Sequence, residues 1–146
     1  MRIRLASRAA AVALASFGLF SLGVPATAQA ASSNARSQYH LDYGDGDYAA
    51  QGNIKWLNRT IVIGGSVTAT EYNCAKVEVV ALHGSLVKKD SRIKCSGEKG
   101  YSFQLQLNVR GGVESAVVRL YASNEGHHRW KMVGSTVCTR NDAICG

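Results

Sequence analysis

The chain has 146 residues, of which 46% are hydrophobic, and its formal net charge is +7. This length suffices for one hydrophobic core and excludes a second. The most basic stretch, Lys88–Lys94, is interrupted by Asp90, so the charge does not form the long basic run of a dedicated nucleic-acid surface. We therefore expect one domain with no specific nucleic-acid partner.

The first thirty residues have the pattern of a secretory signal peptide. Three arginines among the first eight residues precede an uncharged apolar run over residues 9–24, and small residues lead to a predicted cleavage site after Ala30. The apolar run is too short for a stable membrane anchor. Removing residues 1–30, which carry three arginines and no acid, would leave 116 residues with a net charge of +4. We therefore expect a secreted, extracellular protein.

Residues 31–52 are predicted to form a flexible leader ahead of the folded domain, residues 53–146. Within the leader, the segment Asp42–Asp47 places three aspartates and two glycines in six residues. Carboxylates on a tightly turning backbone suit calcium, but the spacing departs from the known calcium-loop frame. The favoured interpretation is a solvated turn, with no metal or cofactor, and calcium is the alternative.

The folded part shows the alternation of β-strands. In residues 101–109 the apolar residues Phe103, Leu105, Leu107 and Val109 alternate with polar ones, which gives one dry and one wet face. Residues 60–70, 76–82 and 114–122 repeat this pattern, the last with Ala116, Val118 and Leu120 pointing inward. In the first of these runs, Gly64-Gly65 indicates a bulge or a close approach of two backbones.

Turn signals separate these runs. They occur at residues 83–85, 96–100, 110–112 and 124–126, and Gly111-Gly112 is a strong signal for a two-residue hairpin between two strands. No amphipathic helical stretch lies between the runs. The pattern predicts an all-β fold, an antiparallel, immunoglobulin-like β-sandwich of about seven strands.

Four cysteines follow the signal segment, and an even number in an exported chain is typical of two disulfides. Three pairings are possible, and short loops favour Cys74–Cys95 together with Cys138–Cys145. Chain entropy would make these bonds worth about 3.4 and 2.5 kcal/mol respectively. The spacings match no zinc site, and no cysteine is left over as a nucleophile.

A hairpin with its two-residue loop at Gly84-Ser85 would set Cys74 opposite Cys95, at a separation that a disulfide allows. The same register places valines opposite Arg92 and Asp90, which is poor patterning for a strand. The alternative is that residues 88–94 form a loop or edge strand that the disulfide ties back.

The richest surface candidate is the cluster His127-His128-Arg129-Trp130-Lys131. On a strand, His128 and Trp130 would share one face and the three remaining residues the other. A tryptophan flanked by cations could stack on a sugar ring or meet an anionic polymer. The favoured alternative places Trp130 in the core, as is also expected of Trp56.

Catalytic motifs are scarce. The sequence contains no G-x-S-x-G, no H-E-x-x-H and no phosphate-binding glycine loop. A pair drawn from four glutamates could serve a glycan-cleaving hydrolase, although Glu78 and Glu114 occupy strand positions that are expected to face solvent. The four are Glu71, Glu78, Glu114 and Glu125. We expect a protein that is not an enzyme.

The chain resembles uncharacterised secreted proteins of actinomycetes in three features. These are the arginine- and alanine-rich signal segment, its end at Ala28-Gln29-Ala30, and the small β-domain with two disulfides. Arg129-Trp130, leading to Thr136-Val137-Cys138-Thr139-Arg140, is similar to the region around the later disulfide of the apo-neocarzinostatin type of chromophore carrier. That resemblance implies a seven-stranded exported sandwich. In this chain the first cysteine loop is longer and Gly146 follows Cys145 directly, so we expect the family's final strand to be absent. The resemblance therefore implies the architecture but not the ligand cleft.

The leading hypothesis is a secreted binding domain for an extracellular protein, a glycan or a cell-wall polymer. Its predicted binding residues are Trp130, Arg129, His128, Tyr121 and Arg140. The second hypothesis is a small-ligand carrier or a protease inhibitor, in which the Cys138–Cys145 loop would present Arg140 as bait. The third is the glycan-cleaving hydrolase.

Overall fold

A computed structural model describes residues 35–124 and 129–146, so the predicted signal peptide and His128 lie outside the described part. The described chain contains strands and no helix. Every pairing between strands is antiparallel. The strands are β1 (Arg36–Tyr43), β2 (Tyr48–Trp56), β3 (Thr60–His83), β4 (Leu86–Gln106), β5 (Ser115–Asn124) and β6 (Lys131–Thr139).

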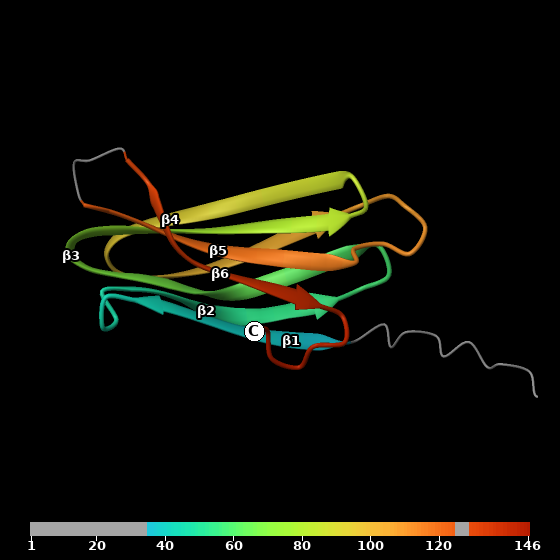
Figure 1. Ribbon diagram of the computed structural model, residues 1–146, viewed down its shortest axis with the longest axis horizontal. Coiled ribbons are helices and arrows are strands. Elements are labelled where there is room, and N and C mark those ends of the chain that lie inside the picture. The colour runs from blue at the N-terminus through green and yellow to red at the C-terminus, as the bar shows by residue number, and fades with distance from the viewer. Residues whose placement is uncertain (1–34, 125–128) are drawn as a thin grey trace, which may run out of the picture.

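The long strand β3 organises the sheet. Its first half pairs with β2 and with the second half of β4, whereas its second half pairs with β5 and with the first half of β4. The sheet order is β1-β2-β3-β5-β6, with β4 beside β3. A bridge between Gln38 and Ile144 brings the chain end after β6 against β1, so the sheet is nearly closed (Figure 1).

The all-β antiparallel prediction is confirmed, but the described chain has six strands instead of about seven. Residues 60–70 and 76–82, predicted as separate strands, are parts of the single 24-residue β3, whose register shifts between Ala69 and Cys74. The turn predicted at residues 96–100 lies within β4, where Ser96 and Gly97 have positive φ angles of 50° and 105°. Glycine and a polar neighbour bend this strand without ending it.

The predicted hairpin at Gly111-Gly112 is wrong. β4 and β5 do not pair with each other, and each pairs with β3 instead. The two glycines do form a turn, because the Gly112 amide donates to the Val109 carbonyl over 3.1 Å. Gly112 lies so close to Asn58 that a Cβ would come within 1.8 Å of its carbonyl oxygen. The turn therefore redirects the chain past the β2–β3 connection.

The strands begin earlier than the sequence predicted. Residues 36–43 and 48–52, placed in a flexible leader, belong to β1 and β2. The Asp42–Asp47 segment is the end of β1 and the turn of that hairpin, since Tyr43 pairs with Tyr48. The glycines and aspartates of this segment are typical of a loop. The flanking strands β1 and β2 are short, and polar residues interrupt their alternation of apolar and polar positions, so the sequence did not predict them.

The core is formed by the inward faces of all the strands, and the predicted alternation is confirmed there. Ala116, Val118 and Leu120 are fully buried, as are Ile61 and Ile63. Trp56 is also fully buried, as expected. The core therefore holds only one of the two tryptophans, because Trp130 lies outside it.

Two glycines make room for a pair of tyrosines across the inner face. Tyr39, Gly52, Gly65 and Tyr101 are successive neighbours on β1, β2, β3 and β4. The hydroxyls of Tyr39 and Tyr101 hydrogen-bond to each other above the glycines. A Cβ on Gly52 would lie 2.6 Å from the Tyr39 hydroxyl and 2.2 Å from the Gly64 carbonyl oxygen. The close backbone approach predicted at Gly64-Gly65 is thus confirmed.

Both predicted disulfides are present. Cys74 and Cys95 are direct partners in the β3–β4 register, and this register continues to the Gly84-Ser85 turn without a shift. The full ten-residue hairpin therefore forms, in spite of the charged residues on its outer strand. Cys138 and Cys145 close the short loop after β6.

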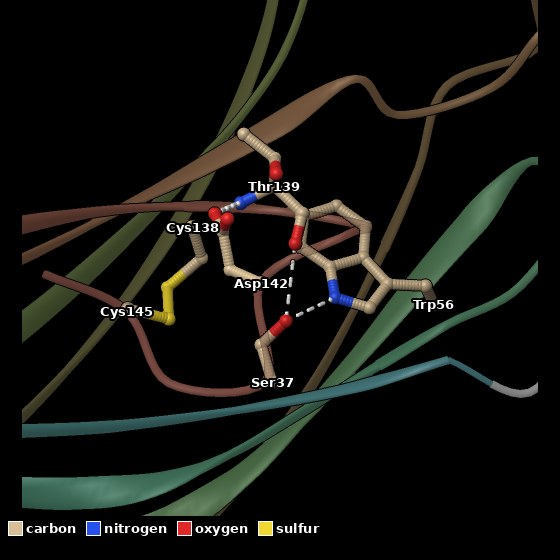
Figure 2. The surroundings of a disulfide bond; sticks show 6 residues. All are labelled: Ser37, Trp56, Cys138, Thr139, Asp142 and Cys145. Atoms are coloured by element: carbon tan, nitrogen blue, oxygen red, sulfur yellow. Dashed lines mark hydrogen bonds between the residues drawn. A yellow bond between two sulfur atoms is a disulfide. The ribbon is translucent and has the colours of Figure 1, made fainter.

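The second disulfide lies beside a hydrogen-bond chain that joins β1, β2 and β6 (Figure 2). The Trp56 indole Nε1 donates to the Ser37 hydroxyl over 2.8 Å, and this hydroxyl donates to the Thr139 carbonyl over 3.1 Å. The Asp142 carboxylate accepts from the Thr139 amide over 2.6 Å. These bonds satisfy buried polar groups where β1 approaches β6.

Candidate functional site

The β1–β2 turn, the end of β5 and the start of β6 all lie on the left of the molecule in Figure 1. Residues of these segments line an open hollow of about 410 Å³. We call it the terminal hollow. Two tyrosines, two cations, two small apolar residues and a serine line it: Tyr43, Tyr48, Arg129, Lys131, Ala122, Val133 and Ser123. It therefore combines ring surface with positive charge.

The tyrosines are held by the β1–β2 hairpin, which pairs Tyr43 with Tyr48. Their ring centroids are 6.2 Å apart, and Tyr43 is 44% exposed. The Tyr48 hydroxyl donates to Asn73 Oδ1 over 2.9 Å. Burial, and then the negative charge of Asp47, raise the pKa of Tyr48. One ring is thus fixed, and the other is available for contact.

The cations lie at the start of β6: Arg129 precedes the strand by two positions, and Lys131 is its first residue. Arg129 and Lys131 are exposed, and neither pairs with an acid among the described residues. Because alternate residues of an extended chain point to the same side, both can reach the hollow while Trp130 points away from it. Their positive charge is therefore available to a ligand.

Trp130 belongs to a cluster on the outer face of β3 and β5, which we call the Lys76 cluster. The Lys76 Nζ lies 4.1 Å from the centroid of the Tyr121 ring and 5.1 Å from that of the Trp130 ring. Both contacts are within cation–π range. Trp130 is half-buried, so the interpretation that it plugs the core is wrong. The Trp130 ring packs against the Lys76 side chain on the surface of the protein.

Glu78 is central to a charge network beside this cluster. Its carboxylate accepts from Arg119 Nη1 over 3.2 Å and from the Tyr121 hydroxyl over 3.1 Å. Its side chain is only 13% exposed, so the expectation that Glu78 faces open solvent is wrong. The network fixes the Tyr121 ring against Lys76.

The glutamates suggested for a hydrolase are separated. Glu114 is 60% exposed, lies near His83 and accepts from the Gly84 amide. Its neighbour Ser115 pairs with Leu82, four strand positions from Glu78, which corresponds to about 13 Å at the usual rise per residue. This exceeds the carboxylate separation of glycosidases. Glu71 is exposed, and Glu125 lies outside the described residues.

The predicted binding residues are not all brought together. Arg129 lines the terminal hollow, whereas Tyr121 and Trp130 lie on the adjoining outer face. Arg140 lies towards the opposite end of β6, and its Nη2 donates to the Leu57 carbonyl over 2.8 Å. This contact turns the Arg140 side chain back onto the protein and does not favour the hypothesis that it protrudes as inhibitor bait.

Sequence reasoning missed Tyr43, Tyr48 and Lys76. The two tyrosines flank the acidic turn symmetrically, and this signal was available once residues 42–47 were read as a hairpin turn. Lys76 gave no local signal, since its partners, Tyr121 on β5 and Trp130 just before β6, lie more than forty residues away in sequence. Lys131 was noted only as a neighbour of Trp130.

Two aspartates of the Asp42–Asp47 segment have separate partners. Asp42 lies 3.4 Å from His40, and Asp47 accepts from the Thr70 hydroxyl over 3.2 Å. Among residues 35–124 and 129–146, no three histidine, cysteine, aspartate or glutamate side chains are placed to hold one metal ion. The turn is thus built from hydrogen bonds.

A second open hollow, of about 470 Å³, lies against β1, β2 and β3. Its side chains are mainly amides and hydroxyls, including Gln38, Gln51, Asn53 and Ser66, with Ile144 at its edge. It also includes the exposed imidazole of His40, but neither a lysine nor an arginine lines it. The terminal hollow is chemically more selective.

No family model matches the chain, and no curated protein or solved structure matches it either. Within the described part of the chain, no helix is both long and apolar enough to span a membrane.

Proposed function

We propose that the protein is a secreted, non-enzymatic binding domain and that the terminal hollow takes an anionic glycan of the cell exterior. One observation carries this proposal: Arg129 and Lys131 line the same open hollow as Tyr43 and Tyr48. Cations attract carboxylate or phosphate groups, and tyrosine rings pack against the apolar face of a sugar. The combination favours a sugar polymer that carries acidic groups.

The Lys76 cluster supports the same ligand class. Trp130 of this cluster lies in sequence between Arg129 and Lys131, which both line the terminal hollow. The partly exposed rings of Trp130 and Tyr121, which both contact Lys76, provide a second place for ring stacking. A polymer, unlike a single sugar, could extend from the hollow onto this face.

Export is supported by two observations of different kinds. The first thirty residues predict a signal peptide. The two disulfides are compatible with an oxidising, extracellular location. The immunoglobulin-like sandwich also remains a proposal; it is supported by the way β2 and β5 pair with different halves of β3.

Co-sedimentation with insoluble cell-wall material tests the function. The probes are peptidoglycan that retains its anionic polymers, the same material after acid stripping, and the neutral polymers chitin and cellulose. We expect binding to the first probe only. Replacing Arg129 and Lys131 together by alanine should weaken it at least tenfold, equivalent to about 1.4 kcal/mol.

The matched control is Arg110→Ala with Lys99→Ala, which removes the same two charges from exposed positions elsewhere. Tyr43→Ala should also weaken binding, whereas Tyr72→Ala should not, although Tyr72 is 71% exposed. Equal losses in the control and test variants would show that only net charge acts, and would refute the site. No binding to any of the polymers would refute the polymer ligand.

A small-ligand carrier is the second candidate, because the volume of the terminal hollow falls within the range of small-molecule sites, about 300–1,000 Å³. Calorimetry with free galacturonic acid, followed by competition with the wall material, separates the two. Tight binding of the monosaccharide with no polymer binding would favour the carrier.

A further inference from the structure

The outer edge of β4 is the longest unpaired strand edge in the described part of the chain. β4 has 21 residues, and β3 is its only strand partner among the residues described. An exposed edge presents unpaired amides and carbonyls, to which a strand of another molecule can pair. The question is what keeps this edge closed.

The register identifies which backbone groups point outward. In a hairpin with a two-residue loop, His83 and Leu86 form the first hydrogen-bonded pair, and bonded and non-bonded pairs then alternate. Ser91 is therefore a non-bonded position, so its amide and carbonyl face away from β3. It lies in the middle of the arm between the turn and Cys95.

Both outward groups of Ser91 are occupied by side chains of its neighbours. The Ser91 amide donates to Asp90 Oδ1 over 2.7 Å, and Arg92 Nη1 donates to the Ser91 carbonyl over 3.2 Å. The two side chains also approach each other, with 3.8 Å between Arg92 Nη1 and Asp90 Oδ1. We call these two residues the edge clamp.

Arg92 has a further contact that holds the clamp in place. Its guanidinium carbon lies 5.0 Å from the centroid of the Phe103 ring on the second half of β4. This cation–π contact covers the core where the two halves of β4 face each other. The residues that gave the hairpin its poor sequence pattern, valines opposite Asp90 and Arg92, are thus the residues that close its edge.

We propose that the edge of β4 around Ser91 is a latent strand-pairing surface for a second copy of this chain, which the Asp90–Arg92 clamp keeps closed. The charges specify the occupant. In an antiparallel pairing centred on Ser91, each Asp90 would face Arg92 of the other copy, so the clamp bonds could re-form between molecules. The same pairing would bring Lys88 opposite Lys94, and this repulsion adds to the barrier.

Sedimentation equilibrium on the oxidised protein, purified from an exporting host, tests this inference. The wild type should be monomeric. Asp90→Ala combined with Arg92→Ala leaves the net charge unchanged and frees both groups of Ser91, so it should dimerise at least tenfold more strongly. Glu98→Ala with Lys99→Ala is the matched control, since it removes one acid and one base from the same edge without uncapping the backbone.

Ser91→Pro added to the double variant removes the outward amide and should restore the monomer. A double variant that folds but stays monomeric, or that associates equally with proline at position 91, would overturn the inference. If loss of the Phe103 contact prevents folding, Asp90→Ala alone frees the Ser91 amide and retains Arg92. It should then show a smaller shift towards dimer, and an unchanged monomer would overturn the inference.

Discussion

The buried tyrosine pair makes the stability of the protein sensitive to alkaline pH. Tyr39 and Tyr101 are only 2% and 8% exposed, and their hydroxyls hydrogen-bond to each other. Burial, followed by the proximity of Tyr101, raises the pKa of Tyr39 far above its usual range. Burial also raises the pKa of Tyr101 to about 12, against the lowering effect of the hydrogen bond to Tyr39. Both groups therefore stay neutral in the folded protein when free tyrosine ionises.

The direction in which the free energy of unfolding changes with pH follows from the number of protons that each state binds. In the unfolded chain both tyrosines titrate near pH 10, so above this pH the unfolded state holds fewer protons than the folded state, and the free energy of unfolding falls as pH rises. Between about pH 9 and pH 11, each tyrosine accounts for a loss of about 1.4 kcal/mol. The pair should therefore cost about 3 kcal/mol over this window, a large part of the stability of a small domain.

Urea unfolding at the two pH values measures the loss, and absorbance near 295 nm counts the phenolates. Tyr39→Phe should reduce the loss by about half, because the remaining Tyr101 is still buried. Subtracting its profile from that of the wild type cancels the titration of the lysines.

All four cysteines are paired, so no free thiol is present to start disulfide exchange. Tyr72→Phe, at an exposed position, should leave the pH dependence unchanged. A wild-type loss below about 1 kcal/mol, or a normal titration of all six tyrosines, would refute the reasoning.

Two further predictions concern stability. Replacing Cys138 and Cys145 together by alanine should lower the free energy of unfolding by about 2.5 kcal/mol, since it releases the loop from the unfolded-state constraint; an unchanged urea midpoint would contradict this. Gly52→Ala should cost more than about 2 kcal/mol in the same assay, because its Cβ would overlap the Gly64 carbonyl. Gly64→Ala is the control, with its nearest neighbouring atom 3.9 Å from the added carbon, and equal losses in both would exclude the steric explanation.

The features that sequence predicted well are local. The Gly84-Ser85 turn fixes the register of its own hairpin, and this register alone places Cys74 opposite Cys95. Alternation identified the inward faces, because a strand with one buried side must repeat with period two. Such features need only the loop length and the pattern of neighbouring residues.

The errors arose where partners are distant in sequence. Gly111-Gly112 forms a turn, but only the long-range pairing of β5 with β3 determines that the flanking strands do not meet. Trp130 lies on the surface because Lys76, far away in sequence, provides a cation for its ring. The hydrogen-bonded pair of Tyr39 and Tyr101 could not be predicted either, because it requires four neighbouring strands in a register that no single segment specifies.

The arginine and lysine side chains of the candidate site differ from several other cations of the molecule in their contacts. Arg92 and Arg140 cap backbone carbonyls, and Arg119 pairs with the largely buried Glu78. These charges stabilise the fold and close its edge, so they have little left to offer a ligand. Arg129 and Lys131 differ, because they are exposed beside two tyrosines and no acid in the described part of the chain neutralises them. Cations of this kind contribute nothing evident to stability. Their position beside two tyrosine rings supports the binding role proposed above, and the Arg129 and Lys131 double variant should bind more weakly while unfolding at the same urea concentration as the wild type.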